Sequence, residues 1–287
     1  MLTTIFYHID EFCKFFSKEV DKRSINIEGI KPFKTRMTAS EIMTIMVYWH
    51  LSGFKNFKVY YVQHVQVHLH KDFPNLVSYS RFVELMKSVS LPLFVFAKYL
   101  NSECTGASFI DSTKLAVCNN RRIYSHKVFK GLANRGKTSM GWFFGFKLHI
   151  VTDEHGNVID FTLSSGNMHD ANKNIIDSLT GKLYGILVGD KGYLGLFSHL
   201  FEQGIKLVHR LRSNMQNQLI SLYEKTLLRK RGSIIETTIG LLKDHLSLEH
   251  SRHRSPSNFL CHIFSSIIAL FFFRARNSFN NELLVDF

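Results

Sequence analysis

The chain has 287 residues, of which 45% are hydrophobic and 21% charged, a composition that supports a packed core and excludes global disorder. Its net charge of +13 favours a polyanionic partner such as nucleic acid. Its four cysteines lie far apart without a Cys-x-x-Cys pair, which argues against structural zinc and a disulfide framework and fits a cytoplasmic protein.

The first hundred residues are predicted to form a helical N-terminal domain, residues 1–100. Apolar residues from Ile5 to Val20 recur at three- and four-residue spacing, which indicates a first helix. A second helix is expected from about Ser40 to Leu51 and a third from Phe57 to Leu69, with Gly53 between them. Ser80 is expected to cap a fourth helix, and Pro92 to open a fifth. The pair around Gly53 is either a helix-turn-helix DNA reader or an ordinary helical hairpin.

The pattern changes to strands after Gly106. Residues 107–111 are predicted to form a short strand that ends in Asp111. Residues 145–151 alternate between apolar and polar and lead through a turn into a strand at 158–163, so we expect an antiparallel hairpin. A helix is expected over about 170–179, capped by Asp170, and a buried strand over 185–190.

A further strand over 206–211 and a long helix from about Ser233 to His245 complete a second domain, residues 101–287. Three strands followed by strand–helix alternation predict an α/β fold, a mixed sheet with flanking helices. The apolar stretch 258–273 is interrupted by polar residues and falls short of the roughly 20 apolar residues that a bilayer requires. It is expected to be a buried core helix, with no membrane contact.

Asp111 and Asp190 each follow a run of apolar residues that is predicted to be a buried strand. Each could simply begin a turn. On adjacent strands, however, both carboxylates would project at one rim of the sheet, where a carboxylate must reach solvent or be paired. Carboxylate oxygens at fixed positions are what two Mg²⁺ ions, roughly 3.5–4 Å apart, require for phosphoryl transfer.

Glu236 lies on the predicted long helix. At about 100° per residue, it falls on a line roughly at a right angle to the centre of the apolar stripe, together with Lys243. A glutamate at such a border can line a cleft or be an ordinary solvated residue, and a lysine two turns away can hold a phosphate. Basic residues flank this helix and lie between the first two strands, and their positions suggest phosphate contacts. The predicted DNA-binding residues are Lys243, Arg229, Lys230, Arg231, Arg252, Arg254, Arg135, Lys137 and Lys147.

Several short segments, in this order, resemble bacterial insertion-sequence transposases of the 982 family. In the second half they are Phe109-Ile-Asp-Ser-Thr113, residues 128–133, residues 141–149, Gly189-Asp-Lys-Gly-Tyr193, residues 234–237, 241–243 and 249–255. Upstream, Phe54-Lys-Asn-Phe-Lys58 and Ser78-Tyr-Ser-Arg-Phe82 continue the resemblance over nearly the whole chain. Each segment is short, and the ordered combination is the specific feature.

This resemblance implies a ribonuclease-H-like catalytic core whose Asp-Asp-Glu triad falls on Asp111, Asp190 and Glu236, which serve as both catalytic residues and metal ligands. It also implies Mg²⁺ or Mn²⁺ as cofactor and double-stranded DNA as partner. The implied reaction is cleavage at the element's terminal inverted repeats and joining of the 3′-hydroxyl to target DNA. Synapsis of two DNA ends leads us to expect at least a homodimer.

One departure stands out. Related transposases often carry Tyr-x2-Arg-x3-Glu-x6-Lys. Here Glu236 and Lys243 keep the last spacing, while Arg229 replaces the tyrosine and Gly232 the arginine. Lys230 and Arg231 are the nearest substitutes for the missing charge. A structure-selective nuclease of the same fold and an inactive DNA-binding remnant of a mobile element remain the alternatives.

Overall fold

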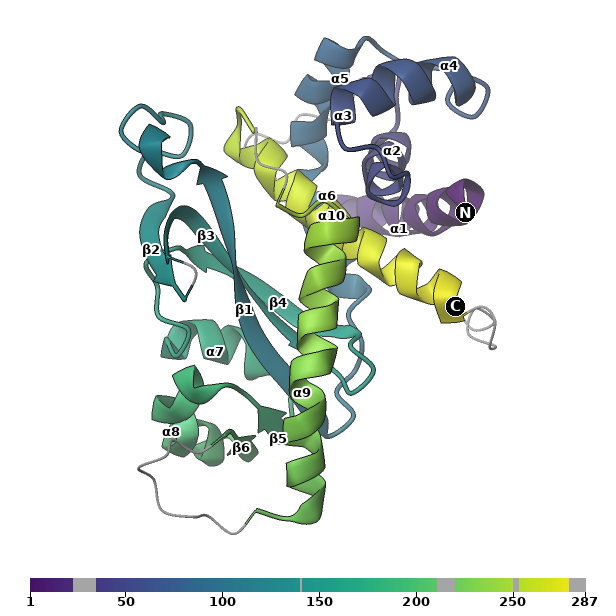
Figure 1. The fold of residues 1–287 in the computed structure, drawn as a ribbon. Coiled ribbons are helices and arrows are strands. Elements are labelled where there is room, and N and C mark those ends of the chain that lie inside the picture. Colours follow the sequence, from purple (N-terminus) through teal and green to yellow (C-terminus); the bar gives the residue numbers. More distant parts are fainter. Residues whose placement is uncertain (23–34, 140, 211–219, 250–252, 279–287) are drawn as a thin grey trace. The chain divides into compact units, whose positions relative to one another are not determined.

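The computed structural model describes residues 1–22, 35–139, 141–210, 220–249 and 253–278. It divides into two compact units, one made of residues 1–100 with 242–287 and the other of residues 101–241 (Figure 1). The division near residue 100 coincides with the change of sequence pattern. Residues from Leu242 onward belong to the same compact unit as the helical N-terminus, whereas the sequence analysis assigns them to the second domain. The boundaries of the functional domains stay a prediction.

The first unit consists of helices whose starts are set by capping side chains. Thr38 and Glu41 form a reciprocal capping box at the start of the second helix, and Ser78, rather than the predicted Ser80, caps the helix that follows Val77. The elements are α1 (Leu2–Lys22), α2 (Ala39–Leu51), α3 (Phe57–Val59), a π-helix (Tyr60–Val65), α4 (Gln66–His68), α5 (Tyr79–Leu85), a 3-10 helix (Met86–Val89), α6 (Ser90–Tyr99) and α10 (Pro256–Ser278).

Helix α10 is the predicted core helix of the apolar C-terminal stretch. By length and composition, residues Pro256–Arg276 could cross a membrane, but 72% of that stretch is buried inside the structure. It packs against α2 and α6 of the same unit. His50 ties α2 to this packing, since its two ring nitrogens lie 2.6 Å from the carbonyl oxygen of Leu246 and 2.9 Å from the hydroxyl of Ser265. Burial among helices therefore accounts for the apolar composition of α10.

The second unit is built on one mixed sheet with the strand order β2-β3-β1-β5-β6, in which β4 also pairs with β3. Strand β1 runs antiparallel to β3 and parallel to β5. The strands are β1 (Ala107–Cys118), β2 (Asn134–Thr138), β3 (Gly141–Thr152), β4 (Val158–Ser165), β5 (Gly185–Val188) and β6 (Ile205–Val208). The helices are α7 (Lys173–Thr180), α8 (Phe197–Glu202) and α9 (Leu222–Gly240), with short 3-10 helices at Asn120–Arg122 and Lys191–Leu196. A π-helix at Leu241–His245 follows α9, and from Leu242 the chain belongs to the first unit.

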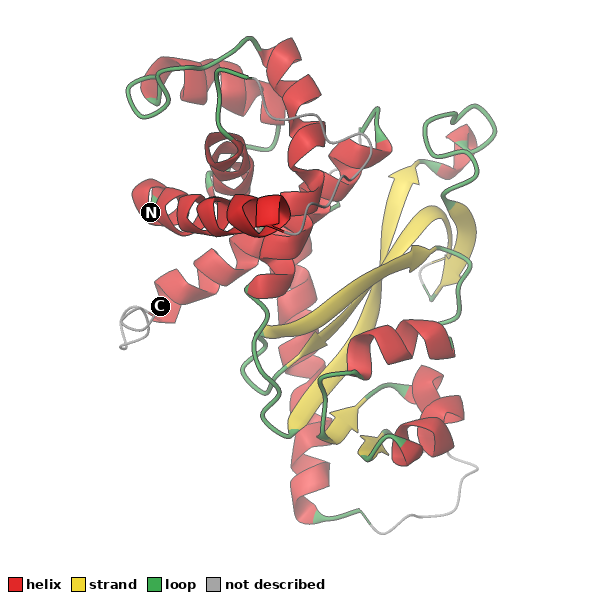
Figure 2. Cartoon of the chain, turned by 180° about the vertical axis from the view of Figure 1, so that it is seen from behind, coloured by secondary structure: helices red, strands yellow, loops and turns green. Residues whose placement is uncertain are grey.

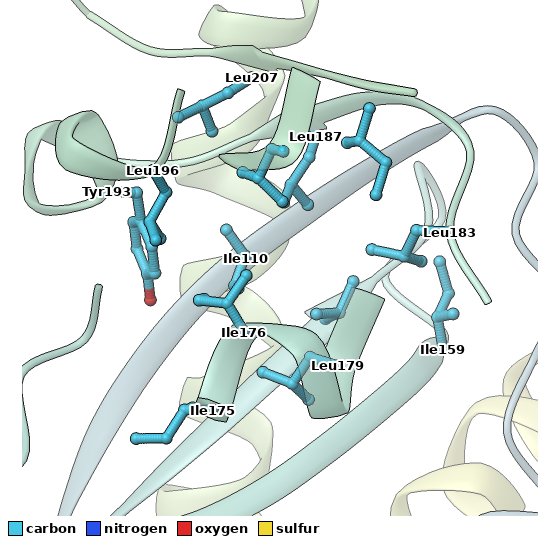
Figure 3. Packing of buried hydrophobic residues seen from close by; sticks show 13 residues of the cluster. Ile110, Ile159, Ile175, Ile176, Leu179, Leu183, Leu187, Tyr193, Leu196 and Leu207 are labelled. Atoms are coloured by element: carbon cyan, nitrogen blue, oxygen red, sulfur yellow. The ribbon is translucent and has the colours of Figure 1, made fainter. Parts of the chain in front are cut away.

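Helices cover both faces of this sheet. On one face, Ile110 packs with Ile176 and Leu179 of α7 and with Tyr193 and Leu196 in a buried apolar cluster (Figure 3). Helix α9 contacts β1 and β5, and the front and back views place it on the face opposite α7 and α8 (Figure 2). The mixed α/β sheet with flanking helices confirms the predicted fold class and is consistent with a ribonuclease-H-like core.

Three predicted elements have different boundaries. The first strand does not end at Asp111 but continues to Cys118, and residues 134–138, expected as loop, form the edge strand β2. Helix α9 begins at Leu222 rather than near Ser233, because Ser221 and Glu224 form a capping box there and Glu224 also pairs with Lys206 of β6. The helix is therefore anchored at its N-terminus to the sheet that it covers.

Candidate active site

Asp111 lies on β1, and Asp190 follows the end of the neighbouring strand β5. The two strands are parallel, with Phe109 opposite Val188, the last residue of β5. Asp111 is two residues beyond Phe109, and Asp190 is two residues beyond Val188, where it caps the 3-10 helix Lys191–Leu196. The pairing with β5 ends just before this point, and β1 continues alone with β3. The prediction that both carboxylates lie at one rim of the parallel strands therefore has a geometric basis, although Asp111 is in the middle of its own strand.

Both carboxylates are held by backbone amides. The amide of Ser112 donates to Asp111 Oδ1 at 2.8 Å, and the amide of Gly192 donates to Asp190 Oδ1 at 2.7 Å. A Cβ atom at Gly192 would lie only 2.9 Å from that Asp190 oxygen, so a larger residue here would displace the carboxylate. Each aspartate has a second carboxylate oxygen that these backbone bonds do not use.

Helix α9 brings the cation of Arg231 to Asp111 and also carries Glu236. Arg231 Nη2 lies 3.3 Å from Asp111 Oδ2 and donates to the carbonyl of Ile110 at 3.2 Å. Glu236 is exposed, five residues further along the helix, and its Oε1 lies 3.7 Å from where a Cβ of Gly232 would be. The Glu236 side chain thus runs back along the helix towards the level of Arg231, the direction that helical side chains take. The described residues contain no group of three His, Cys, Asp or Glu side chains close enough to hold a metal ion.

Three carboxylates, those of Asp111, Asp190 and Asp170, lie close enough to repel one another. Burial raises the pKa of Asp111, and the nearby carboxylates of Asp190 and Asp170 raise it further, while Arg231 and the Ser112 amide oppose the shift. Burial and the same three carboxylates raise the pKa of Tyr193 well above its ordinary value. The Tyr193 hydroxyl is buried and has no hydrogen-bond partner among the described residues. A positive charge at this place would relieve the repulsion between the carboxylates.

Asp170 is held by hydrogen bonds to Ser112 of β1 and Lys147 of β3. Ser112 follows Asp111 directly, so its side chain points to the face of β1 opposite that of Asp111. Its Oδ1 accepts hydrogen bonds from Ser112 Oγ at 2.8 Å and from Lys147 Nζ at 3.0 Å. Lys147 also donates to the carbonyl of Met168 at 2.9 Å, and the buried His149 ring has its Nδ1 4.0 Å from Asp170. The predicted role of Asp170 as a helix cap is wrong, because Asn172 caps α7.

Some of the predicted DNA-binding residues are exposed, and others are already buried or ion-paired within the protein. Lys147 is buried with the two partners just described, Lys243 forms a 2.7 Å ion pair with Glu249, and Arg231 is engaged by Asp111. DNA contacts by these three stay predictions, and each would require an existing bond to break. Exposed side chains are found at Arg229, Lys230, Arg254, Arg135 and Lys137. Arg252 lies outside the described residues.

Arg135 and Lys137 occur on an exposed edge of the sheet. Both lie on β2 and flank the ring of Trp142 on β3, at 4.9 Å for the Arg135 guanidinium carbon and 5.6 Å for Lys137 Nζ. Trp142 itself is 51% exposed. An exposed aromatic ring between two cations is suited to a nucleic-acid strand, because the cations meet phosphates and the ring offers a stacking surface.

A comparison with protein families matches residues 101–256 to a family described as the transposase DDE domain. The match covers more than half of the chain and includes Asp111, Asp190 and Glu236. The chain belongs to the transposase DDE-domain family. No curated protein matches it significantly. Assignment to the 982 family in particular stays a prediction.

DDE-domain transposases generally use divalent metal ions and act on DNA. The donor chemistry of this site fits such an ion, since the carboxylate oxygens of Asp111 and Asp190 are hard ligands near each other and near the buried Tyr193 hydroxyl, which has no partner among the described residues. Arg231 supplies a compensating positive charge to Asp111 directly. The sequence carries no local signal for this ion pair, because the two residues are far apart in the chain.

Proposed function

We propose that the chain is an insertion-sequence transposase that cuts DNA at the terminal inverted repeats of its element and joins the freed 3′-hydroxyl to target DNA. The observation that supports this most directly is that Asp111 on β1 and Asp190 just past the end of β5 occupy corresponding positions of two parallel neighbouring strands, against which the helix that carries Glu236 packs. We further propose that the protein acts on bacterial DNA in the cytoplasm. At least two copies would act together, because both ends of an element must be joined to one target.

In this proposal Asp111, Asp190 and Glu236 hold Mg²⁺ or Mn²⁺. Such ions, when bound there, would supply activation of the attacking oxygen and stabilisation of the leaving oxygen of the phosphodiester. The attacking groups are water and then a DNA hydroxyl, so the protein supplies no nucleophile. The backbone amides of Ser112 and Gly192 orient one oxygen of each aspartate, and the other oxygen is the one that would bind an ion, which at Asp111 requires Arg231 to release it. Arg231 balances the charge of Asp111 while no ion is bound.

The test is cleavage of the DNA that flanks the gene, assayed with and without Mg²⁺, followed by capture of labelled ends in a target plasmid. Asp111→Ala, Asp190→Ala and Glu236→Ala are expected to abolish cleavage while duplex binding is retained. Glu202→Ala is the matched control for Glu236, since Glu202 is also an exposed glutamate on a helix of the same unit. Normal cleavage by a folded Glu236→Ala protein would remove that residue from the triad. Nicks without any joined product would indicate a nuclease instead.

A further inference from the structure

The helical unit contains a cavity of about 620 Å³, which lies within the range of roughly 300–1,000 Å³ typical of ligand sites. Three segments of the sequence that the catalytic triad leaves unexplained meet in its wall. Segment 54–58 contributes Phe57 and Lys58, segment 78–82 contributes Tyr79, and segment 249–255 contributes Arg254. The three segments are far apart in the sequence and come together only in the fold.

The chemistry of the lining is aromatic and basic. Trp49 and Phe57 meet edge to face with ring centroids 5.3 Å apart, and Phe57 lies 6.5 Å from the ring of Tyr79. Lys58 Nζ is 5.9 Å from the centre of the Tyr79 ring, and the positive charge of Arg254 acts on the same tyrosine. None of the described residues that line the cavity is acidic. Flat rings beside two cations suit a planar base attached to a phosphate.

One polar group of a lining residue is buried and unsatisfied. Asn258 is only 7% exposed, and its side-chain nitrogen donates to the carbonyl of Val83 at 3.2 Å. Its Oδ1 has no hydrogen-bond partner among the described residues. A buried unsatisfied acceptor is costly, and this one belongs to a residue that lines the cavity.

We propose that this cavity takes up one unpaired nucleotide of a DNA strand, with the base stacked among Trp49, Phe57 and Tyr79 and the adjoining phosphates held by Lys58 and Arg254. DNA is favoured over a free nucleotide because both cations are exposed, where they can reach the phosphates that flank an extruded base. The inference rests on DNA being the partner in the proposed function, but it does not require that DNA be cut.

The experiment measures binding in EDTA, which prevents metal-dependent cleavage. The probes are a duplex of about 30 base pairs with one unpaired thymidine, the same duplex with an abasic residue at that position, and the fully paired duplex. Stacking of one base contributes enough for the unpaired thymidine to bind about five- to a hundredfold more tightly than the abasic probe. Tyr79→Ala should remove most of that difference, while Tyr79→Phe, which keeps the ring, should retain it. Lys58→Gln should weaken binding of the unpaired-thymidine and abasic probes alike, because both keep the flanking phosphates.

Matched controls come from the same unit. Tyr7 is a tyrosine with 60% exposure and Lys55 is an exposed lysine of the same segment as Lys58, and neither lines the cavity. Tyr7→Ala should therefore keep the preference for the unpaired base, and Lys55→Gln should keep the affinity for both probes. Since the chain has only two tryptophans, a Trp142→Phe background leaves Trp49 as the sole reporter, and its fluorescence should fall with the thymidine probe and not with the abasic one.

Equal binding of the three probes, unchanged by Tyr79→Ala and Lys58→Gln, would overturn this inference and leave the proposed function intact. No binding to any of the probes would overturn both. If thymidine monophosphate competed as well as the unpaired-thymidine duplex, the cavity would be a site for free nucleotides, and the inference that it binds a DNA strand would be wrong.

Discussion

Replacing Lys147 by methionine tests whether this lysine stabilises the fold or contacts DNA. The sequence predicts a DNA contact, whereas the structure shows a buried side chain. The Lys147 ammonium donates to Met168 O and to Asp170 Oδ1, at 2.9 and 3.0 Å, and its side chain is 10% exposed. The variant leaves Asp170 with the Ser112 hydroxyl as its remaining donor and removes a donor from the Met168 carbonyl. We therefore expect a loss of stability and no direct loss of DNA contacts.

The magnitude follows from the two bonds. A hydrogen bond to a charged group contributes about 1.5–3 kcal/mol and an ordinary one about 1 kcal/mol. Because Asp170 is 33% exposed, water offsets part of the first contribution. We expect Lys147→Met to lower the free energy of unfolding by about 2–3 kcal/mol, which corresponds to a melting temperature lower by about 5–10 °C for a unit of this size. Urea and thermal denaturation followed by circular dichroism would measure both.

Lys137→Met is the matched control, because Lys137 is an exposed lysine on the neighbouring strand. It should leave stability nearly unchanged and reduce the dependence of log affinity on log salt by about 0.9, the value for one phosphate contact. Lys147→Met should keep the wild-type salt dependence, measured below its melting temperature. The reasoning is refuted if Lys147→Met is as stable as the wild type and loses the salt dependence of one phosphate contact.

Three further predictions concern other groups of the same unit. Burial lowers the pKa of His149 from 6.5 to about 4, so the folded state prefers the neutral ring. As pH falls from 6.5 to about 4, the free energy of unfolding should therefore decrease by about 3 kcal/mol on account of this group. The His149 imidazole resonances should not titrate above about pH 5. The Lys206 ion pair and helix-cap bonds lower the pKa of Glu224 below 4.5, so Glu224→Gln should cost about 1–2 kcal/mol near neutral pH, a difference that disappears in urea titrations as pH falls below that value. Gly192→Ala should slow cleavage by displacing the carboxylate that its amide holds, whereas Gly195→Ala, where a Cβ meets nothing within 4 Å, should not.

The hydrophobic periodicity of the sequence is sufficient for the elements that bury one clear face. Strands β3, β4 and β5 follow from alternation or from short apolar runs, and α1 and α2 follow from helical spacing. Strand β2 cannot be found in this way, because Asn134-Arg-Gly-Lys-Thr138 has no apolar alternation. It is a strand because β3 offers its backbone groups as partners, and such pairing is not encoded in the segment itself.

At the site, the sequence predicts that the two aspartates lie near the same rim of the sheet. It does not predict which side chains contact them. A charged residue at Asp111 interrupts the apolar run and so suggests a strand end, yet Thr113 and Leu115 continue the buried positions beyond it. The start of α9 does have a local signal, the capping-box spacing Ser221-x2-Glu224, but the glycine and the few apolar residues in the first half of the helix favour a later start. The partners of Asp170 come from other strands and have no local signal.

The pairing of Arg231 with Asp111 constrains how a cation could enter between the carboxylates. Helix α9 is fixed near this point, because Ile235 is fully buried and Thr238 donates to the carbonyl of Gly156 in the β3–β4 turn at 3.2 Å. Rotation of the helix would break this packing, whereas the long arginine side chain can change rotamer while the backbone stays in place. Exchange of a guanidinium for a metal ion at Asp111 is therefore expected to be a side-chain movement, with Glu236 already carried on the same fixed helix.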